Sequence, residues 1–179
     1  MRTRPAAVAG LFYADDPATL RADVADHLAA ADTPCVDPPK ALIVPHAGLV
    51  YSGPIAATAY RTIAAMTERI ERVVLLGPAH RVGICGLAAP TVAAFDTPLG
   101  MGSIDQGAID GIMHFPQVAR RDDVHAREHS LEVQLPFLQH LLGTFSLVPL
   151  AVGHATADEV AVVLDTLWGG SETLILISS

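Results

Sequence analysis

The sequence predicts an α/β fold in which a mainly parallel sheet carries helices on both faces. Short apolar runs alternate with stretches of helical periodicity along most of the 179 residues, which is the pattern of βαβ units. These runs hold few polar residues, as expected for strands that are buried on both faces. Hydrophobic residues make up 51% of the chain and charged residues 17%, which excludes an intrinsically disordered chain.

The first predicted element is a helix with Asp16 as its N-cap and Pro17 in its first turn. Its apolar side is formed by residues that recur at helical spacing, Leu20, Val24 and Leu28. A Pro-rich connection over residues 33–39 then separates this helix from the first strand.

Strands and helices alternate in the rest of the chain. The predicted strands cover residues 41–44, 73–76, 145–152 and 173–177, with one or two irregular strands within residues 84–94. The predicted helices cover residues 54–66, 103–115, 130–142 and 157–168, the last capped by Thr156 and Glu159. Ser103 and Gln106 form a potential capping box for the second of these helices. Pro136 predicts either a kink in the third or a start displaced toward Leu135.

Charge and cysteine content exclude several classes of protein. Eleven Lys and Arg against nineteen Asp and Glu give a net charge of −8, and Lys40 is the only lysine, so a nucleic-acid partner is not expected. The longest apolar stretches are well short of the roughly 18 residues that span a membrane. Cys35 and Cys85 are too few for a disulfide framework, which favours the cytoplasm. Phosphate-loop, dinucleotide-binding and nucleophile-elbow motifs are absent.

Two histidines follow two predicted buried strands at the same offset. His46 follows the strand at 41–44, and His80 follows the strand at 73–76. Ligands of parallel α/β sheets bind beyond the carboxyl ends of the strands. If the two strands are neighbours, about 4.8 Å apart, both imidazoles can converge on one point. Two neutral imidazoles are the ligands that a zinc or non-haem iron centre requires, although each ring could instead hydrogen-bond a loop carbonyl.

A second polar segment opens the helix predicted at 130–142. His129 and Glu132 are three residues apart, a spacing that suits metal binding or acid–base chemistry. Glu128 and Glu132 could instead only complement the positive end of the helix dipole. His125 is expected either in the same cleft or on the surface.

Two further residues of metal-binding type are assigned other roles. We expect His154 to have a loop role, because it directly precedes the Thr156 cap. Cys85 lies in a Gly-flanked apolar run, and we expect it to be a small buried side chain.

Five ordered segments together resemble the Memo family, also called AmmeMemoRadiSam system protein B. They cover residues 4–13, 45–48, 51–53, 76–80 and 128–137. The resemblance implies a fold similar to the class III extradiol (LigB-type) non-haem iron dioxygenases. It also implies that residues 1–179 form a single Memo-like domain, and we expect this to be an N-terminal part of a longer domain. The family typically continues Ser-Ser-Asp-x-x-His, whereas this sequence stops at Ser178-Ser179.

The resemblance implies a metal site and a cleft around it. His46 and His80 correspond to the two histidine ligands, and Glu128 and His129 become the candidate catalytic residues. A third ligand, a cysteine in the family, is expected outside this chain. The candidate substrate-cleft residues are Tyr51, Ser52, Glu132 and Ser179. The implied cofactor is iron, with copper or zinc as alternatives.

The expected function is redox or oxygenase-type activity on an unknown substrate, as in a metal-dependent oxidoreductase. Two alternatives stay open: a non-catalytic module that binds a peptide or partner on the same scaffold, and a zinc-dependent hydrolase. The expected partners are a small molecule or a peptide, with neither nucleic acid nor membrane. The family's name alone suggests an association with a radical-SAM protein.

Overall fold

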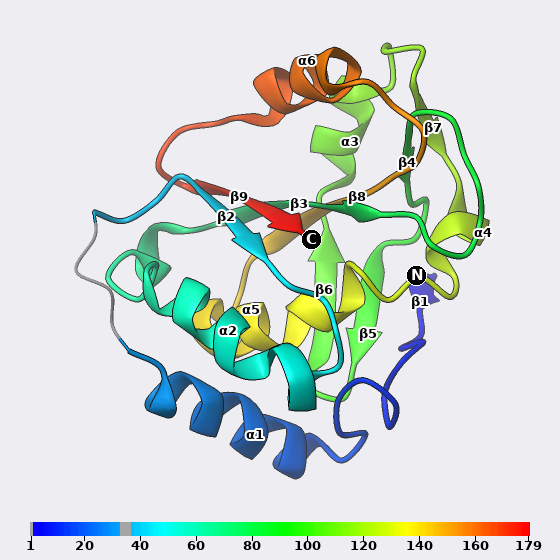
Figure 1. The fold of residues 1–179 in the computed structure, drawn as a ribbon. Helices are drawn as coiled ribbons and strands as arrows, with labels where there is room; N and C mark the ends of the chain where they lie inside the picture. The colour runs from blue at the N-terminus through cyan, green and yellow to red at the C-terminus, as the bar shows by residue number, and fades with distance from the viewer. Residues whose placement is uncertain (1, 33–36) are drawn as a thin grey trace.

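The computed structural model describes residues 2–32 and 37–179, and it has the predicted α/β architecture. A central, mostly parallel sheet separates two layers of helices (Figure 1). The helices are α1 (Pro17–Ala30), α2 (Leu49–Arg61), α3 (Gln106–Ile112), α4 (Asp122–His125), α5 (Leu135–Leu142) and α6 (Ala157–Leu167), with short 3-10 helices η1 (Thr67–Arg69) and η2 (Glu132–Gln134). Helices α1, α2 and α5 lie on one face, and α3 and α6 lie on the other (Figure 1).

The strands of the described residues form a single sheet. They are β1 (Thr3–Arg4), β2 (Ala41–Val44), β3 (Arg72–Pro78), β4 (Leu87–Ala89), β5 (Ala94–Thr97), β6 (Gly100–Ile104), β7 (Val118–Arg120), β8 (Ser146–Val152) and β9 (Thr173–Ser178). Their order is β1-β5-β6-β8-β3-β9-β2, and β4 additionally pairs with β7 and β8. All pairs are parallel except β4–β8 and the β5–β6 hairpin.

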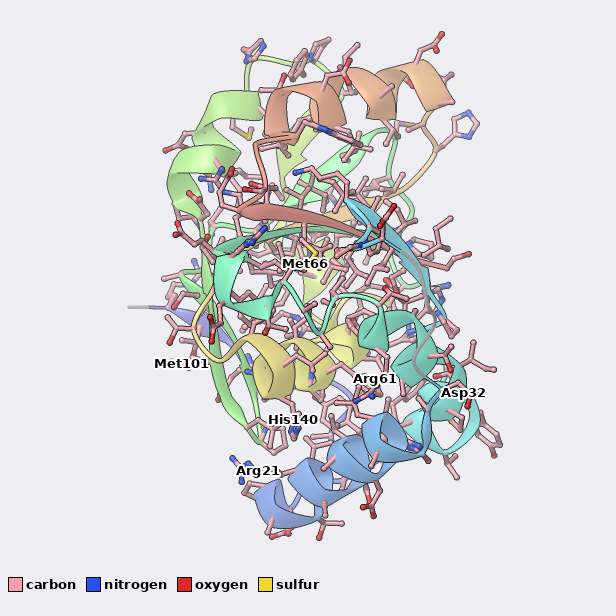
Figure 2. The ribbon with its side chains drawn as sticks, turned by 90° about the vertical axis from the view of Figure 1, so that its left-hand side faces the viewer. Arg21, Asp32, Arg61, Met66, Met101 and His140 are labelled. Atoms are coloured by element: carbon pink, nitrogen blue, oxygen red, sulfur yellow. The ribbon has the colours of Figure 1, made fainter. Side chains whose placement is uncertain are left out.

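The centre of the sheet is built from β3, β8 and β9, whose residues are almost all buried. Burial on both faces explains why these strands are continuous apolar runs in the sequence. Helices α2 and α5 cover one face, and α1 packs beneath them as the outermost layer (Figure 2). The carboxyl ends of β2, β9 and β3 consequently lie in a row at one edge of the sheet.

Several predicted elements are confirmed. The strand at 41–44 is β2, and the other three strands agree with β3, β8 and β9 to within a few residues. Asp16 caps α1 by accepting a hydrogen bond from the Thr19 amide. Thr156 and Glu159 form a reciprocal capping box at α6.

The prediction of a helix at 54–66 is wrong in its boundaries, because α2 begins at Leu49 and ends at Arg61. Pro54 is therefore an interior residue of the helix rather than its start. The buried stripe of α2 already begins at Leu49 and runs to Tyr60. Packing of this stripe outweighs the single backbone hydrogen bond that a proline removes.

The prediction of a helix at 103–115 is also wrong at its start. Ser103 lies in β6, which pairs with β5 in a hairpin, so Ser103 does not cap the helix. Asp105 is the actual N-cap of α3 and accepts a hydrogen bond from the Ala108 amide. Gly100 allows the hairpin turn, because its φ of 119° is unfavourable for other residues.

At the third predicted helix, the displaced start is the correct alternative. Helix α5 begins at Leu135 with Pro136 in its first turn, and η2 precedes it.

None of the helices in the described part of the chain combines the length and the apolar character needed to cross a bilayer.

The cysteine assignments have different outcomes. Cys85 is exposed, which contradicts the prediction of a buried side chain, because the strand β4 begins only at Leu87. Cys35 and part of the Pro-rich connection lie outside the described residues.

Candidate metal centre

Three histidines from separate parts of the chain converge at the carboxyl edge of the sheet. His46, His80 and His129 each offer a ring nitrogen, and these nitrogens lie within 4.8 Å of one another. The His46 ring centroid is 5.2 Å from that of His80 and 5.6 Å from that of His129. The rings of His80 and His129 are stacked with centroids 4.6 Å apart. Such spacing allows one ion to contact all three nitrogens.

The two strands that precede His46 and His80 are not neighbours, so the expected adjacency of these strands is wrong. Strand β9 lies between β2 and β3, and the end of β9 carries Ser178. The two rings approach each other beyond these strand ends, where Ser178 Oγ lies 3.2 Å from His46 Nδ1. The middle strand thus contributes a polar contact to the site.

Glu128 fixes the orientation of the His80 ring. One carboxylate oxygen, Oε2, accepts the His80 backbone amide at 2.6 Å, and the other, Oε1, lies 2.9 Å from His80 Nδ1. The carboxylate also accepts the amides of His129 and Ser130, both at 2.9 Å. Because an ionised carboxylate only accepts hydrogen bonds, Nδ1 of His80 carries the proton and Nε2 has a free lone pair.

The Glu128 carboxylate is 1% exposed and ionised. Burial raises its pKa, but the hydrogen bonds from the His80 ring, the Ser130 amide and the His80 amide outweigh burial and bring the pKa to about 2. The histidine cluster therefore faces a permanent negative charge at neutral pH. This charge favours a cation at the same place.

The His46 ring is oriented by a hydrogen-bond chain whose direction can be read from its donors. Ser178 donates its only hydroxyl proton to the Ser130 carbonyl at 2.6 Å. Ser178 Oγ also accepts from Gln134 Nε2 at 2.9 Å, and the Gln134 amide is itself oriented because Tyr60 donates to its oxygen. With its proton committed, Ser178 can only accept from His46 Nδ1. His46 therefore also has Nε2 free as a ligand.

His129 supplies the third nitrogen and lacks such a fixed partner. Its Nδ1 is buried and has no hydrogen-bond partner among the described residues, although Glu128 Oε1 is 3.4 Å away. The Phe12 ring lies beside it, with centroids 4.7 Å apart. Burial lowers the pKa of His129, and burial together with the neighbouring His80 and His129 rings lowers that of His46. Both rings are therefore neutral, as metal ligands must be.

The sequence suggests a catalytic role for His129 and a third ligand outside the chain. The structure brings His129 into the same cluster as His46 and His80, so three nitrogen donors lie within the described residues. The spacing between His129 and Glu132 does not identify this ligand, because Glu132 is fully buried and pairs with Arg4. The usable signal is that Glu128 and His129 are adjacent, so one carboxylate can hold both His80 and the start of this segment.

The other residues expected in the cleft lie around the cluster in different ways. Tyr51 is 81% exposed on α2, and Ser52 donates its hydroxyl proton to the Ala47 carbonyl. Ser179 is exposed, and its amide donates to Val44. No polar contact joins these three side chains to the histidine rings in the described part of the chain.

Glu132 joins the N-terminal segment to the site. Its buried carboxylate accepts the amides of Ala7 and Val8 and the Tyr13 hydroxyl, and it pairs with Arg4 at 2.6 Å. The network thus ties down the chain on both sides of Phe12, the residue that contacts His129. The roles of Arg4 and Tyr13 cannot be predicted from the sequence, because contacts between residues more than a hundred positions apart leave no local pattern.

His125 and His154 lie outside the cluster. His125 is 2% exposed and belongs neither to the cluster nor to the surface, so both expected positions are wrong; its Nε2 lies 3.0 Å from the Ala88 carbonyl. His154 is exposed and forms a bridge with Cys85 in a loop region.

The chain is similar to a known family over nearly its whole length. The family model for Memo-like proteins matches residues 4–179. A MEMO1 family protein of Aquifex aeolicus is 37% identical over 187 aligned residues, covering 100% of this chain and 67% of the relative. Relatives with the same family name are 35% identical in Ignicoccus hospitalis and 39% identical in Aeropyrum pernix.

These two alignments include 97% and 88% of this chain, but only 65% and 60% of the relatives. It thus spans about two thirds of the length of the curated relatives that it matches. The family assignment rests on both kinds of similarity, which agree over most of the sequence. The chain therefore belongs to the Memo-like protein family.

Proposed function

We propose that this chain holds a non-haem metal ion with His46, His80 and His129 and supports redox or oxygenase-type chemistry on an organic substrate. One observation carries the proposal: three ring nitrogens lie within 4.8 Å of one another. In two of the rings, Nδ1 is engaged by Glu128 or Ser178, which leaves Nε2 free. A metal-binding histidine usually has its second nitrogen engaged in this way.

The donors fit a transition metal better than a hard cation. Neutral imidazoles suit iron, copper, zinc and nickel, whereas calcium and magnesium prefer oxygen ligands. The unpartnered, buried Nδ1 of His129 and its lowered pKa also fit a ring that is neutral and engaged at its other nitrogen. We propose iron as the resident metal, with copper as an alternative. Three protein ligands leave coordination positions open for a substrate.

Bound iron or copper would supply one-electron redox chemistry at this site. The chain's own residues would orient the site around it. Glu128 would hold His80 and maintain the negative charge, Ser178 would hold His46, and Phe12 would limit the access of water to His129. His129 would act here as a ligand rather than as a proton donor or acceptor.

A zinc-dependent hydrolase is the second candidate function. The observation that favours it is the donor set, because three histidines also form the zinc site of carbonic anhydrase. The partners stay proposals as well: a small molecule or peptide as the ligand, and a radical-SAM protein as a functional associate. A non-catalytic binding module with the same cleft would bind its partner without turnover.

The experiment is elemental analysis of the purified chain, followed by anaerobic titration of the metal-free chain with Fe(II), Cu(I) and Zn(II). The variants His46→Ala, His80→Ala and His129→Ala are compared with His140→Ala. His140 is an exposed histidine on α5 outside the cluster, so it serves as the matched control (Figure 2). The folding of each variant is checked by circular dichroism.

We expect one metal ion per chain in the unmodified protein and in the control. Each cluster variant should lose at least tenfold in affinity for the metal. Equal uptake by folded cluster variants and by the control would refute the site. Tighter binding of zinc than predicted by the usual order of divalent metals, with hydrolysis of a model ester, would favour the second candidate.

A further inference from the structure

A cleft of about 640 Å³ lies beside the histidine cluster. Three segments of the chain form its walls: residues 7–12, residues 81–82 and residues 123–127. Figure 1 shows how the N-terminal segment and α4 come together on this side of the molecule. The volume is in the range of clefts that bind small molecules.

Each wall leads into a residue of the cluster or contacts one. Arg81 follows His80, and Arg127 is two residues before His129. Phe12 lines the cleft and also lies against the His129 ring at a centroid distance of 4.7 Å. A molecule in this cleft would therefore lie next to the proposed metal ligands.

The cleft carries two cations without partners. Arg81 and Arg127 are exposed, and neither has a hydrogen bond or an ion pair in the described part of the chain. Asp123 also lines the cleft, but Arg121 holds its carboxylate with two bonds of 2.8 and 2.7 Å. The free charge of the cleft is therefore positive, although the whole chain has a net charge of −8.

The remaining lining is apolar. Val8, Leu11, Phe12 and Val82 contribute side chains, and Leu11 is 80% exposed. Two unpaired guanidinium groups next to an apolar wall are complementary to a molecule with an oxyanion at one end and an apolar body at the other. Guanidinium groups bind carboxylate and phosphate oxygens in a planar, often bidentate geometry.

We infer that this cleft binds a small organic anion, whose carboxylate or phosphate group contacts Arg81 and Arg127 while its apolar body packs on Leu11 and Phe12. The inference names the substrate class of the metal centre and in this respect rests on the proposed function. Binding of the anion itself needs only the two arginines and the apolar wall. It is therefore testable in the metal-free chain.

The test is a titration of the metal-free chain with benzoate, phenyl phosphate and the neutral benzyl alcohol, followed by NMR. The variants are Arg81→Gln, Arg127→Gln and the double variant. Arg21→Gln is the matched control, because Arg21 is exposed on α1 and does not line the cleft. Comparison of benzoate with phenyl phosphate decides which oxyanion the cleft prefers.

Each single arginine variant should bind the preferred anion about tenfold more weakly, and the double variant about a hundredfold more weakly. The control should bind as the unmodified chain does, and benzyl alcohol should bind more weakly than the anions and independently of both arginines. Equal affinity of the double variant and the unmodified chain would overturn the inference. So would failure of both anions to perturb residues of the cleft.

Metal uptake of the double variant separates this inference from the proposed function. Neither arginine has a hydrogen bond to a ring nitrogen in the described part of the chain, and the positive charge of Arg81 lowers the pKa of His129. Removing this charge does not disfavour a cation, so the double variant should take up metal at least as well as the unmodified chain. Loss of anion binding with intact metal uptake supports the inference. Arginine-dependent anion binding in a chain that takes up no metal would support the cleft and refute the metal centre.

Discussion

The Glu128 carboxylate holds His80 at two points, with 2.6 Å to its backbone amide and 2.9 Å to its ring Nδ1. One buried charge thereby fixes both the loop after β3 and the side chain that the loop presents. The same carboxylate accepts two amides of its own segment, including that of His129. A single residue thus ties the His80 ring to the backbone of His129, the next ligand along the chain.

We predict that Glu128→Gln weakens metal binding by about ten- to a hundredfold, because the amide loses the charge and can present a donor toward His80 Nδ1. The dissociation constant for Fe(II) is measured by competition with a chelator. Glu68→Gln, at an exposed position outside the site, is the control and should bind as the unmodified chain does. Unchanged affinity in a folded Glu128→Gln variant would show that the carboxylate has no role in the metal site.

A second prediction concerns the buried ion pair of Arg4 and Glu132. Glu132 is fully buried, and its carboxylate accepts two backbone amides and the Tyr13 hydroxyl in addition to Arg4. Glu132→Gln leaves the Arg4 guanidinium buried without its counter-charge. We expect the free energy of unfolding in urea to fall by about 3–5 kcal/mol.

The control for this pair is a double-mutant cycle with Arg4→Met. Removing both charges should cost less than the sum of the two single changes, because neither charge is then left unpaired. Strict additivity of the two single changes would contradict a direct coupling between Arg4 and Glu132.

A third prediction concerns acid stability and His125. Burial lowers the pKa of His125 to about 4, because its effect is larger than that of the hydrogen bond to Ala88, which raises the pKa. In the unfolded chain the ring titrates near 6.5. Between these two values the unfolded state binds a proton that the folded state excludes, so stability is present above about pH 6.5 and falls as the pH decreases toward 4.

The corresponding variant is His125→Gln, whose amide can still donate to the Ala88 carbonyl. From pH 7 to pH 4 the unmodified chain should lose roughly 3 kcal/mol more unfolding free energy than this variant loses. His140→Gln changes an exposed histidine and should follow the unmodified chain. Parallel pH profiles of the unmodified chain and His125→Gln would exclude a buried, neutral His125.

The sequence predicts the central strands well because burial on both faces makes them continuous apolar runs, as in β3 and β9. It does not predict their neighbours: β9 lies between β2 and β3, although it is the last strand in the sequence. Sequence order contains no information on this crossover. The approach of His46 and His80 follows from both histidines lying at the carboxyl edge of a parallel sheet, even though the assumed adjacency of their strands is wrong.

The supporting contacts of the site are beyond prediction from local patterns. Ser178 orients the His46 ring although it is 132 residues away in the sequence. Gln134, in a helical segment, in turn holds Ser178. Neither residue occurs at a spacing typical of metal ligands. Arg4 and Glu132 are 128 residues apart. Such pairs become visible only when the topology brings their segments together. The helix boundaries failed for a different reason, since Pro54 and Ser103 carry start signals that packing and strand pairing override.

The final prediction tests the hydrogen-bond chain at His46. In Ser178→Ala the acceptor for His46 Nδ1 is lost, and Gln134 Nε2 keeps only its bond to the Pro45 carbonyl. The His46 ring is then free to rotate or to change its tautomer, and we expect about tenfold weaker metal binding. Ser171→Ala, outside the site, is the control and should leave affinity unchanged. Because Ser178 contacts only His46 among the three rings, its loss combined with His46→Ala should weaken binding no further than His46→Ala alone.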